Sequence, residues 1–178
     1  MNYVILIFSI FFLIGCTVSS DNPLSNFEKE KIDKSLAGVW ALKKKKNTHY
    51  IHIIVDEKSK LFKIVMVEDN LDTREFSAHN TDINENNYLN VRFEKDYKDN
   101  RYFLFKYKVS SDELQIGMIE YEKVEKAISE KTLLGKLQGG YGSSILYITE
   151  SQEKLQKFIK EHNSELFSKM TIFKKLKI

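Results

Sequence analysis

Tyr88-Leu89-Asn90-Val91-Arg92-Phe93-Glu94 is the stretch that indicates the architecture of this chain most clearly. Its apolar and polar residues alternate, which is the pattern of a β-strand with one face in a core and the other in water. The alternation returns from Phe103 to Val109 and, after the turn residues Ser110 to Asp112, from Leu114 to Met118. These runs predict consecutive antiparallel strands.

Other segments extend this pattern. Two earlier runs, from Tyr50 to Val55 and from Leu61 to Val67, are apolar on both faces and are joined by a hairpin-length connection. Further strands are predicted at Leu146 to Thr149 and Thr171 to Leu176, and helical spacing is seen from Tyr121 to Leu134 and from Gln152 to Lys169. The fold class is therefore mainly β (α+β), a small antiparallel barrel of about eight strands with two helices, one of them near the C-terminus.

The first barrel strand is expected at Gly38-Val39-Trp40, preceded by Leu36. This G-x-W triplet resembles the first strand of the lipocalins and the wider calycin barrels. That resemblance implies a lipocalin-like barrel in which Trp40, the only tryptophan, closes one end. Thr81-Asp82-Ile83 is similar to the T-D-Y motif of these barrels, and Arg101 to their closing arginine. The barrel domain is expected to span residues 36–178.

The N-terminus carries a targeting signal. Tyr3 to Gly15 has the length and apolar character of a signal-peptide core, and it is shorter than the roughly 20 residues that cross a bilayer. Leu13-Ile14-Gly15-Cys16 resembles the lipobox of bacterial lipoproteins, in which the leucine and the small residue are recognised by the signal peptidase. The resemblance implies that residues 1–15 are a signal peptide and that Cys16 is lipidated. An ordinary cleaved signal peptide with a coincidental cysteine is the alternative.

Residues 16–35 are predicted to form a lipidated N-terminus and a flexible tether. Thr17 to Asn26 is polar and holds the only proline, Pro23, so disorder is expected there. Because Thr17, and not aspartate, follows Cys16, the lipoprotein resemblance implies the outer membrane facing the periplasm, or the outer face of the plasma membrane in a single-membrane bacterium. The C-terminal stretch from Ile148 to Leu176 is similar to the C-termini of small, mostly uncharacterised bacterial envelope lipoproteins.

Composition excludes several chemistries. Cys16 is the only cysteine, which rules out disulfides within the chain, thiolate zinc sites and CxxC redox chemistry. Residues 1–15 carry no charged side chain, so the formal net charge of +3 belongs to the remainder. This small excess does not indicate a nucleic-acid partner. No cofactor is predicted.

Histidines do not suggest a metal site. His49 and His52 are three residues apart on a strand and therefore lie on opposite faces. His162 has no second ligand at helical spacing. Serine chemistry is likewise unsupported, because Ser143 and Ser144 follow glycine without a G-x-S-x-G elbow.

Two surface segments are candidates for binding. Gly139, Gly140, Tyr141 and Gly142 form a glycine-rich connection without the spacing of a phosphate loop; it is either a flexible loop at the barrel mouth or a ligand loop. The four lysines from Lys43 to Lys46 either contact anionic lipid headgroups or protect a strand end.

The sequence thus predicts a lipid-anchored envelope protein without catalytic activity. Its barrel would bind an apolar small molecule, a lipid or a protein partner. The alternative is a structural, interaction or inhibitor lipoprotein with a barrel filled by its own side chains, since about eight strands enclose room for side chains or one small ligand. An envelope hydrolase with an unrecognised site is the third hypothesis.

Overall fold

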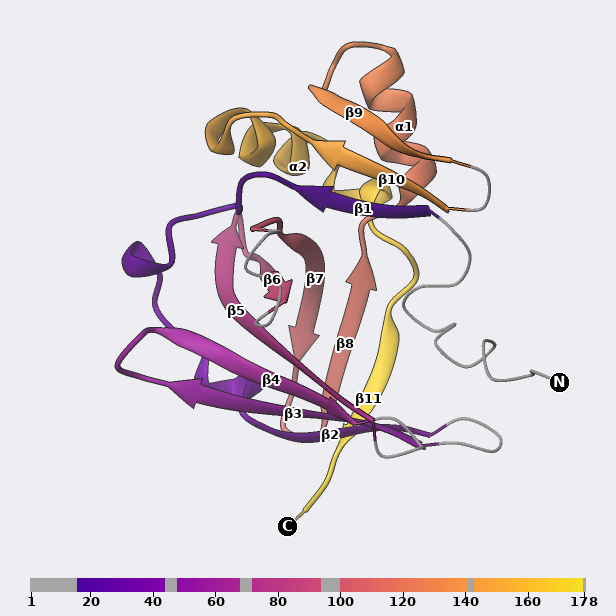
Figure 1. The fold of residues 1–178 in the computed structure, drawn as a ribbon. Helices are drawn as coiled ribbons and strands as arrows, with labels where there is room; N and C mark the ends of the chain where they lie inside the picture. The colour runs from indigo at the N-terminus through magenta and orange to yellow at the C-terminus, as the bar shows by residue number, and fades with distance from the viewer. Residues whose placement is uncertain (1–15, 44–47, 68–71, 94–99, 141–142, 178) are drawn as a thin grey trace, which may run out of the picture.

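A closed barrel dominates the structure, a computed structural model that describes residues 16–43, 48–67, 72–93, 100–140 and 143–177 (Figure 1). Within these ranges, eight antiparallel strands are joined in the order β11-β2-β3-β4-β5-β6-β7-β8. The predicted fold class is confirmed, with two α-helices and one of them near the C-terminus. The barrel strands are β2 (Gly38–Lys43), β3 (Thr48–Asp56), β4 (Leu61–Val67), β5 (Thr73–Ile83), β6 (Asn86–Phe93), β7 (Phe103–Val109), β8 (Glu113–Met118) and β11 (Thr171–Lys175).

The interior of the barrel is packed with large side chains. Inward-facing residues alternate along each strand, and the strand register brings Trp40 opposite Ile51 and Phe62 opposite Ala78. The largest interior side chains, which are fully buried, are Trp40, Phe62, Tyr107 and Phe173. This packing forms the first of two hydrophobic cores.

A second layer lies against the outside of the barrel. It consists of a three-stranded sheet in the order β1-β10-β9 and the helices α1 and α2, grouped together at the top of Figure 1. Outward-facing Tyr88 and Leu104 of the barrel wall pack into a second core with this layer. Its elements are β1 (Cys16–Ser20), α1 (Tyr121–Ser129), β9 (Gly135–Gly140), β10 (Ser143–Ile148) and α2 (Gln152–Leu166).

The segment that follows Cys16 is not a disordered tether, which corrects the prediction for Thr17 to Asn26. β1 pairs in parallel with β10, and the backbone of Ser20 exchanges two 2.8 Å hydrogen bonds with that of Tyr102. Val18 and Leu24 are buried in the second core. Two apolar side chains and this backbone pairing outweigh the polar composition from which disorder was inferred.

The glycine-rich connection is also different from its prediction. Gly139 and Gly140 belong to β9, which pairs with β10 in the small sheet, whereas Tyr141 and Gly142 lie outside the described residues. The strand predicted at Leu146 belongs to the same sheet and not to the barrel. Gly135, at the start of β9, is required by close packing, because a Cβ at this position would lie 2.3 Å from Cδ1 of Ile128.

Both helices are shorter than the sequence predicted. α1 ends at Ser129, and Lys131 follows with a φ of 61°, outside the right-handed helical region. α2 begins at an N-cap serine, Ser151, and ends at Leu166, where Phe167 pairs with Ile119 at the end of the barrel wall.

Strand β5 was absent from the sequence prediction. Its residues Ser77, His79, Asn80 and Thr81 are polar, yet all four are buried. It joins β6 through Asn84 and Glu85, both at positive φ (51° and 63°), as a two-residue hairpin turn requires.

Leu24→Ala tests whether the N-terminal segment is part of the folded unit. Leu24 is 0% exposed, so its truncation should lower the free energy of unfolding by about 2–5 kcal/mol in chemical denaturation. Leu134→Ala is the matched control because Leu134 is 54% exposed, and its effect should stay within about 0.5 kcal/mol. Equal, small effects of both substitutions would mean that residues 17–26 are a tether after all.

Candidate functional site

One end of the barrel is closed by the chain that leads into β2. Two short 3-10 helices, η1 (Phe27–Lys29) and η2 (Lys34–Leu36), lie on this stretch. Asn80 is an inward-facing residue of β5. Its side chain accepts a hydrogen bond from the Asp33 amide at 3.1 Å and donates one to the Lys31 carbonyl at 3.0 Å. The Tyr107 hydroxyl donates to Asp33 at 2.8 Å, and burial together with this contact raises the pKa of Tyr107. This segment therefore covers the interior where the turns after β3, β5 and β7 lie.

Inward-facing apolar residues at the opposite end are only half-buried. They are Leu42, Met66, Phe93, Phe103 and Phe105, and this set is the apolar end of the barrel. The Phe93 ring lies 4.9 Å from Phe76 and 5.5 Å, edge to face, from Phe103, measured between centroids. Among the residues that the structure describes, aromatic side chains are thus half-buried at this end of the barrel, whereas the N-terminal segment covers the other end.

Two polar residues also occupy inward-facing positions at the apolar end. Strand register places His49 opposite Leu42 and Arg74 opposite Met66, and both side chains are half-buried. The apolar end therefore combines aromatic surface with an imidazole and a guanidinium, which suits a molecule with an apolar body and a polar or anionic head.

A buried polar network lies on the outer face of β5 and β6. The Asn90 side chain accepts from the Leu24 amide at 2.6 Å and donates to the Thr81 hydroxyl at 2.8 Å. The Ser25 hydroxyl contacts that of Thr81 at 2.5 Å, and His79 Nε2 donates to the Ser25 carbonyl at 2.9 Å. These contacts satisfy buried polar groups and attach residues 24–25 to the barrel wall.

This environment favours the neutral form of the His79 imidazole. Burial lowers the pKa of its imidazole below the ordinary value of 6.5, and the hydrogen bond to the Ser25 carbonyl opposes that shift only in part. The donated bond fixes the tautomer that carries the proton on Nε2. Sequence reasoning missed this site because it missed β5; the outward alternation of Ser77, His79 and Thr81 was the available signal.

The G-x-W residues lie at the closed end. Trp40 is fully buried, its Nε1 donates to the Leu36 carbonyl at 2.8 Å, and the Lys175 ammonium lies 4.9 Å from its ring centroid. Gly38 has a φ of 139°, and a Cβ there would lie 2.7 Å from Cε of Lys175. Arg101 instead covers the Tyr147 ring at 3.9 Å, so the cation beside Trp40 is Lys175 and not the predicted arginine.

The other predicted residues are dispersed. Cys16 is the first residue of β1 and pairs with Ser144, whereas Leu13 and Gly15 lie outside the described residues. Gly139 and Gly140 are in the small sheet, so the glycine-rich strand does not contribute to the apolar end. Lys43 ends β2, and the three lysines that follow it lie outside the described residues.

Metal and hydrolase sites were not expected from the sequence. Among the residues that the structure describes, no three or more His, Cys, Asp or Glu side chains could hold a metal ion together. Ser143 and Ser144 are residues of β10, and His162 contacts Glu165 at 3.3 Å and the Phe158 ring at 4.6 Å. In the described part of the chain, no helix has the length and apolar character to cross a membrane.

Comparison with models of protein families, with curated proteins and with solved structures gives no match. The lipocalin-like and lipoprotein resemblances of the sequence therefore stay predictions.

His79→Gln tests the buried network through pH. Because the pKa of His79 is lower in the folded chain than the ordinary 6.5, the unfolded chain takes up a proton first as the pH falls, and the free energy of unfolding decreases. This loss should appear between about pH 7.5 and about pH 5.5 in denaturant titrations. Glutamine can keep the donor to Ser25 without titrating, so the variant should lose less stability over this range.

His52→Gln is the control for that experiment, because His52 is exposed on the outward face of β3. It should retain the pH dependence of the unchanged protein. A pH profile that is the same in all three proteins would contradict the assignment of His79.

Proposed function

We propose that this chain is a lipid-anchored bacterial envelope protein that binds an apolar ligand, without catalysis, at the apolar end of its barrel. The observation that carries the proposal is that Leu42, Met66, Phe93, Phe103 and Phe105, all inward-facing and half-buried, gather at the end of the barrel opposite the one that the N-terminal segment covers. Apolar surface that stays in water in the free protein is a source of binding energy, at about 25 cal/mol per Å² removed from water.

The filled middle of the barrel limits where a ligand can bind. Trp40, Phe62, Tyr107 and Phe173 occupy the interior towards the closed end. A ligand would therefore contact the apolar end and not pass through the barrel. Arg74 and His49 at this end favour a ligand whose head is polar or anionic, such as an acyl chain with an acidic group.

The lipid anchor is the second part of the proposal. It is supported by the lipobox-like Leu13-Ile14-Gly15-Cys16. Acylation by two or more chains would hold the protein stably at a membrane, because each buried methylene contributes about 0.8 kcal/mol and a single chain is marginal. We accordingly assign the protein to the cell envelope.

A second function is favoured by a different surface. On the outward faces of β3 and β11, and directly after β11, lie the large apolar side chains of Tyr50, Ile54, Ile172 and Leu176, which are 38–46% exposed. This set is the outer wall. Exposed apolar groups on one wall suit a protein partner, as in the structural or inhibitor role.

Phe103→Ala distinguishes the two functions. Loss of this ring from the apolar end should weaken binding of a fluorescent fatty acid about tenfold, equivalent to about 1.4 kcal/mol. Ile54→Ala, on the outer wall, should leave fatty-acid binding unchanged. Thermal denaturation would verify that both variants fold. Unchanged binding in Phe103→Ala would contradict a ligand site at the apolar end.

Cys16→Ser tests the anchor. The hydroxyl cannot form the thioether to diacylglycerol, so acyl labelling in cells and recovery in the membrane fraction should be lost, with uncleaved precursor accumulating. Radiolabelled palmitate and the mass of the purified protein are the measurements. Thr17→Ser is the control and should be acylated normally; persistent labelling of Cys16→Ser would refute the lipobox reading.

A further inference from the structure

We propose that the Cys16 edge of the small sheet, with the apolar end of the barrel beside it, faces the bilayer surface. The Cys16 edge is the end of the sheet formed by Cys16 in β1, Ser144 in β10 and Gly139 in β9. This inference rests on the proposed acylation of Cys16. To that acylation it adds a fixed orientation of the protein relative to the bilayer.

The residue that would carry the acyl chains is itself part of the folded unit. Cys16 is itself a paired residue of β1, in register with Ser144. Four residues later, Ser20 is joined to the backbone of Tyr102 by hydrogen bonds of 2.8 Å in both directions. Acyl chains on Cys16 would therefore be attached to a hydrogen-bonded strand that is continuous with the barrel wall.

An exposed apolar side chain lies on the small sheet near Cys16. Leu137 on the edge strand β9 is 59% exposed and lies in the register row of Val18, two rows from Cys16. At ordinary strand dimensions, its Cα is about 7 Å along and about 10 Å across the sheet from that of Cys16. An exposed leucine at this separation can enter the interfacial region of a bilayer into which the acyl chains insert.

Two cations flank the same part of the sheet. The Arg101 guanidinium lies 3.9 Å and the Lys136 ammonium 5.9 Å from the centroid of the buried Tyr147 ring, one register row beyond Leu137. Anionic headgroups would attract these charges. Because successive residues of a strand point to opposite faces, Lys136 and Tyr147 lie on the other face of the sheet from Leu137, so both faces near the Cys16 edge carry groups that suit a lipid surface.

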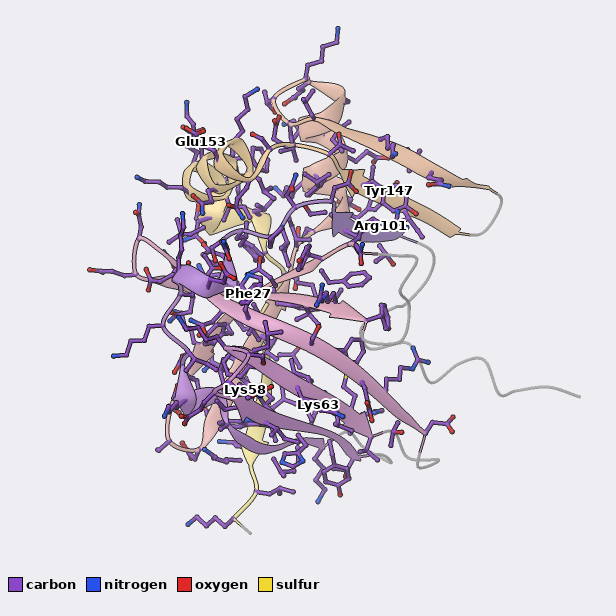
Figure 2. The ribbon with its side chains drawn as sticks, turned by 60° about the vertical axis from the view of Figure 1, so that its left-hand side comes forward. Phe27, Lys58, Lys63, Arg101, Tyr147 and Glu153 are labelled. Carbon is purple, nitrogen blue, oxygen red and sulfur yellow. The ribbon has the colours of Figure 1, made fainter. Side chains whose placement is uncertain are left out.

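The apolar end is oriented by the same contacts. Phe103 directly follows Tyr102, and Arg101 contacts the small sheet at Tyr147, so the first residues of β7 lie between the sheet and the apolar end. Figure 1 places the start of β1 on the same side of the molecule as the ends of β2 and β4. Figure 2 places Arg101 and Tyr147 away from Lys58, which lies in the turn between β3 and β4 at the closed end. The ligand of the apolar end would then be exchanged directly with membrane lipid.

Depth-dependent quenching tests this orientation in the intact acylated protein. Bimane would be attached to Leu137→Cys or, as a control at the closed end, to Lys58→Cys; Cys16 is the only native cysteine and is blocked by acylation. The proteins would be reconstituted in vesicles of phosphatidylcholine and phosphatidylglycerol that carry nitroxide-labelled lipid. We expect the nitroxide lipids to quench the bimane at position 137 and not the bimane at position 58.

Acylation is measured separately, by the mass of each intact protein. Acyl chains on Cys16 with equal quenching at the two positions, or with none at position 137, would overturn the orientation and leave the anchor standing. A mass without acyl chains would overturn both. The role of Leu137 is tested with the bimane attached to Lys43→Cys, near the apolar end. Adding Leu137→Glu should reduce the quenching of this bimane, whereas adding Leu134→Glu, at the far end of the edge strand, should leave it unchanged. Equal effects of the two glutamates would overturn the role of Leu137.

Discussion

The hydrogen-bonding requirement of the outer face of β5 and β6 determines how the N-terminal part of the chain runs. His79, Thr81 and Asn90 are buried, and a buried polar group without a partner costs about 1–3 kcal/mol. Backbone and side-chain groups of residues 24–25 provide partners for them. Once these residues are fixed, the chain on one side is directed to β1 and on the other to the closed end of the barrel.

The cover on part of the barrel wall affects which residue types its strands carry on their outer face. β5 and β6 face the N-terminal segment on the outside, so both faces of these strands are buried although many of their residues are polar. β3 and β4 show the reverse: both faces are largely apolar in sequence, yet the outer wall at Tyr50 and Ile54 stays exposed. Polar residues on a strand face of this chain therefore indicate buried hydrogen-bonding partners as often as they indicate exposure to solvent.

The barrel could be predicted from the sequence because its inward alternation is regular, as in Phe103, Phe105 and Tyr107. Periodicity could not reveal β5, because the pairing of Asn90 with Thr81 and Leu24 depends on residues far apart in the chain. The same limit applies to β1, whose partner β10 lies more than a hundred residues away. Of the candidate site, the alternation of the sequence placed Phe103 and Phe105 on one face of a predicted strand, whereas the closure of one end by Asp33 and Asn80 required the structure.

Barrel closure depends on a strand at the very end of the chain. β11 pairs with β8 and with β2, bringing Lys175 opposite Trp40, and both helices and two strands of the small sheet, β9 and β10, are inserted between β8 and β11. Until β11 is in place, β2 and β8 have open edges that can pair with other chains. Contacts this distant in sequence also slow folding. A chain of this topology completes its barrel only when its last strand becomes available for pairing, and until then it depends on protection from aggregation.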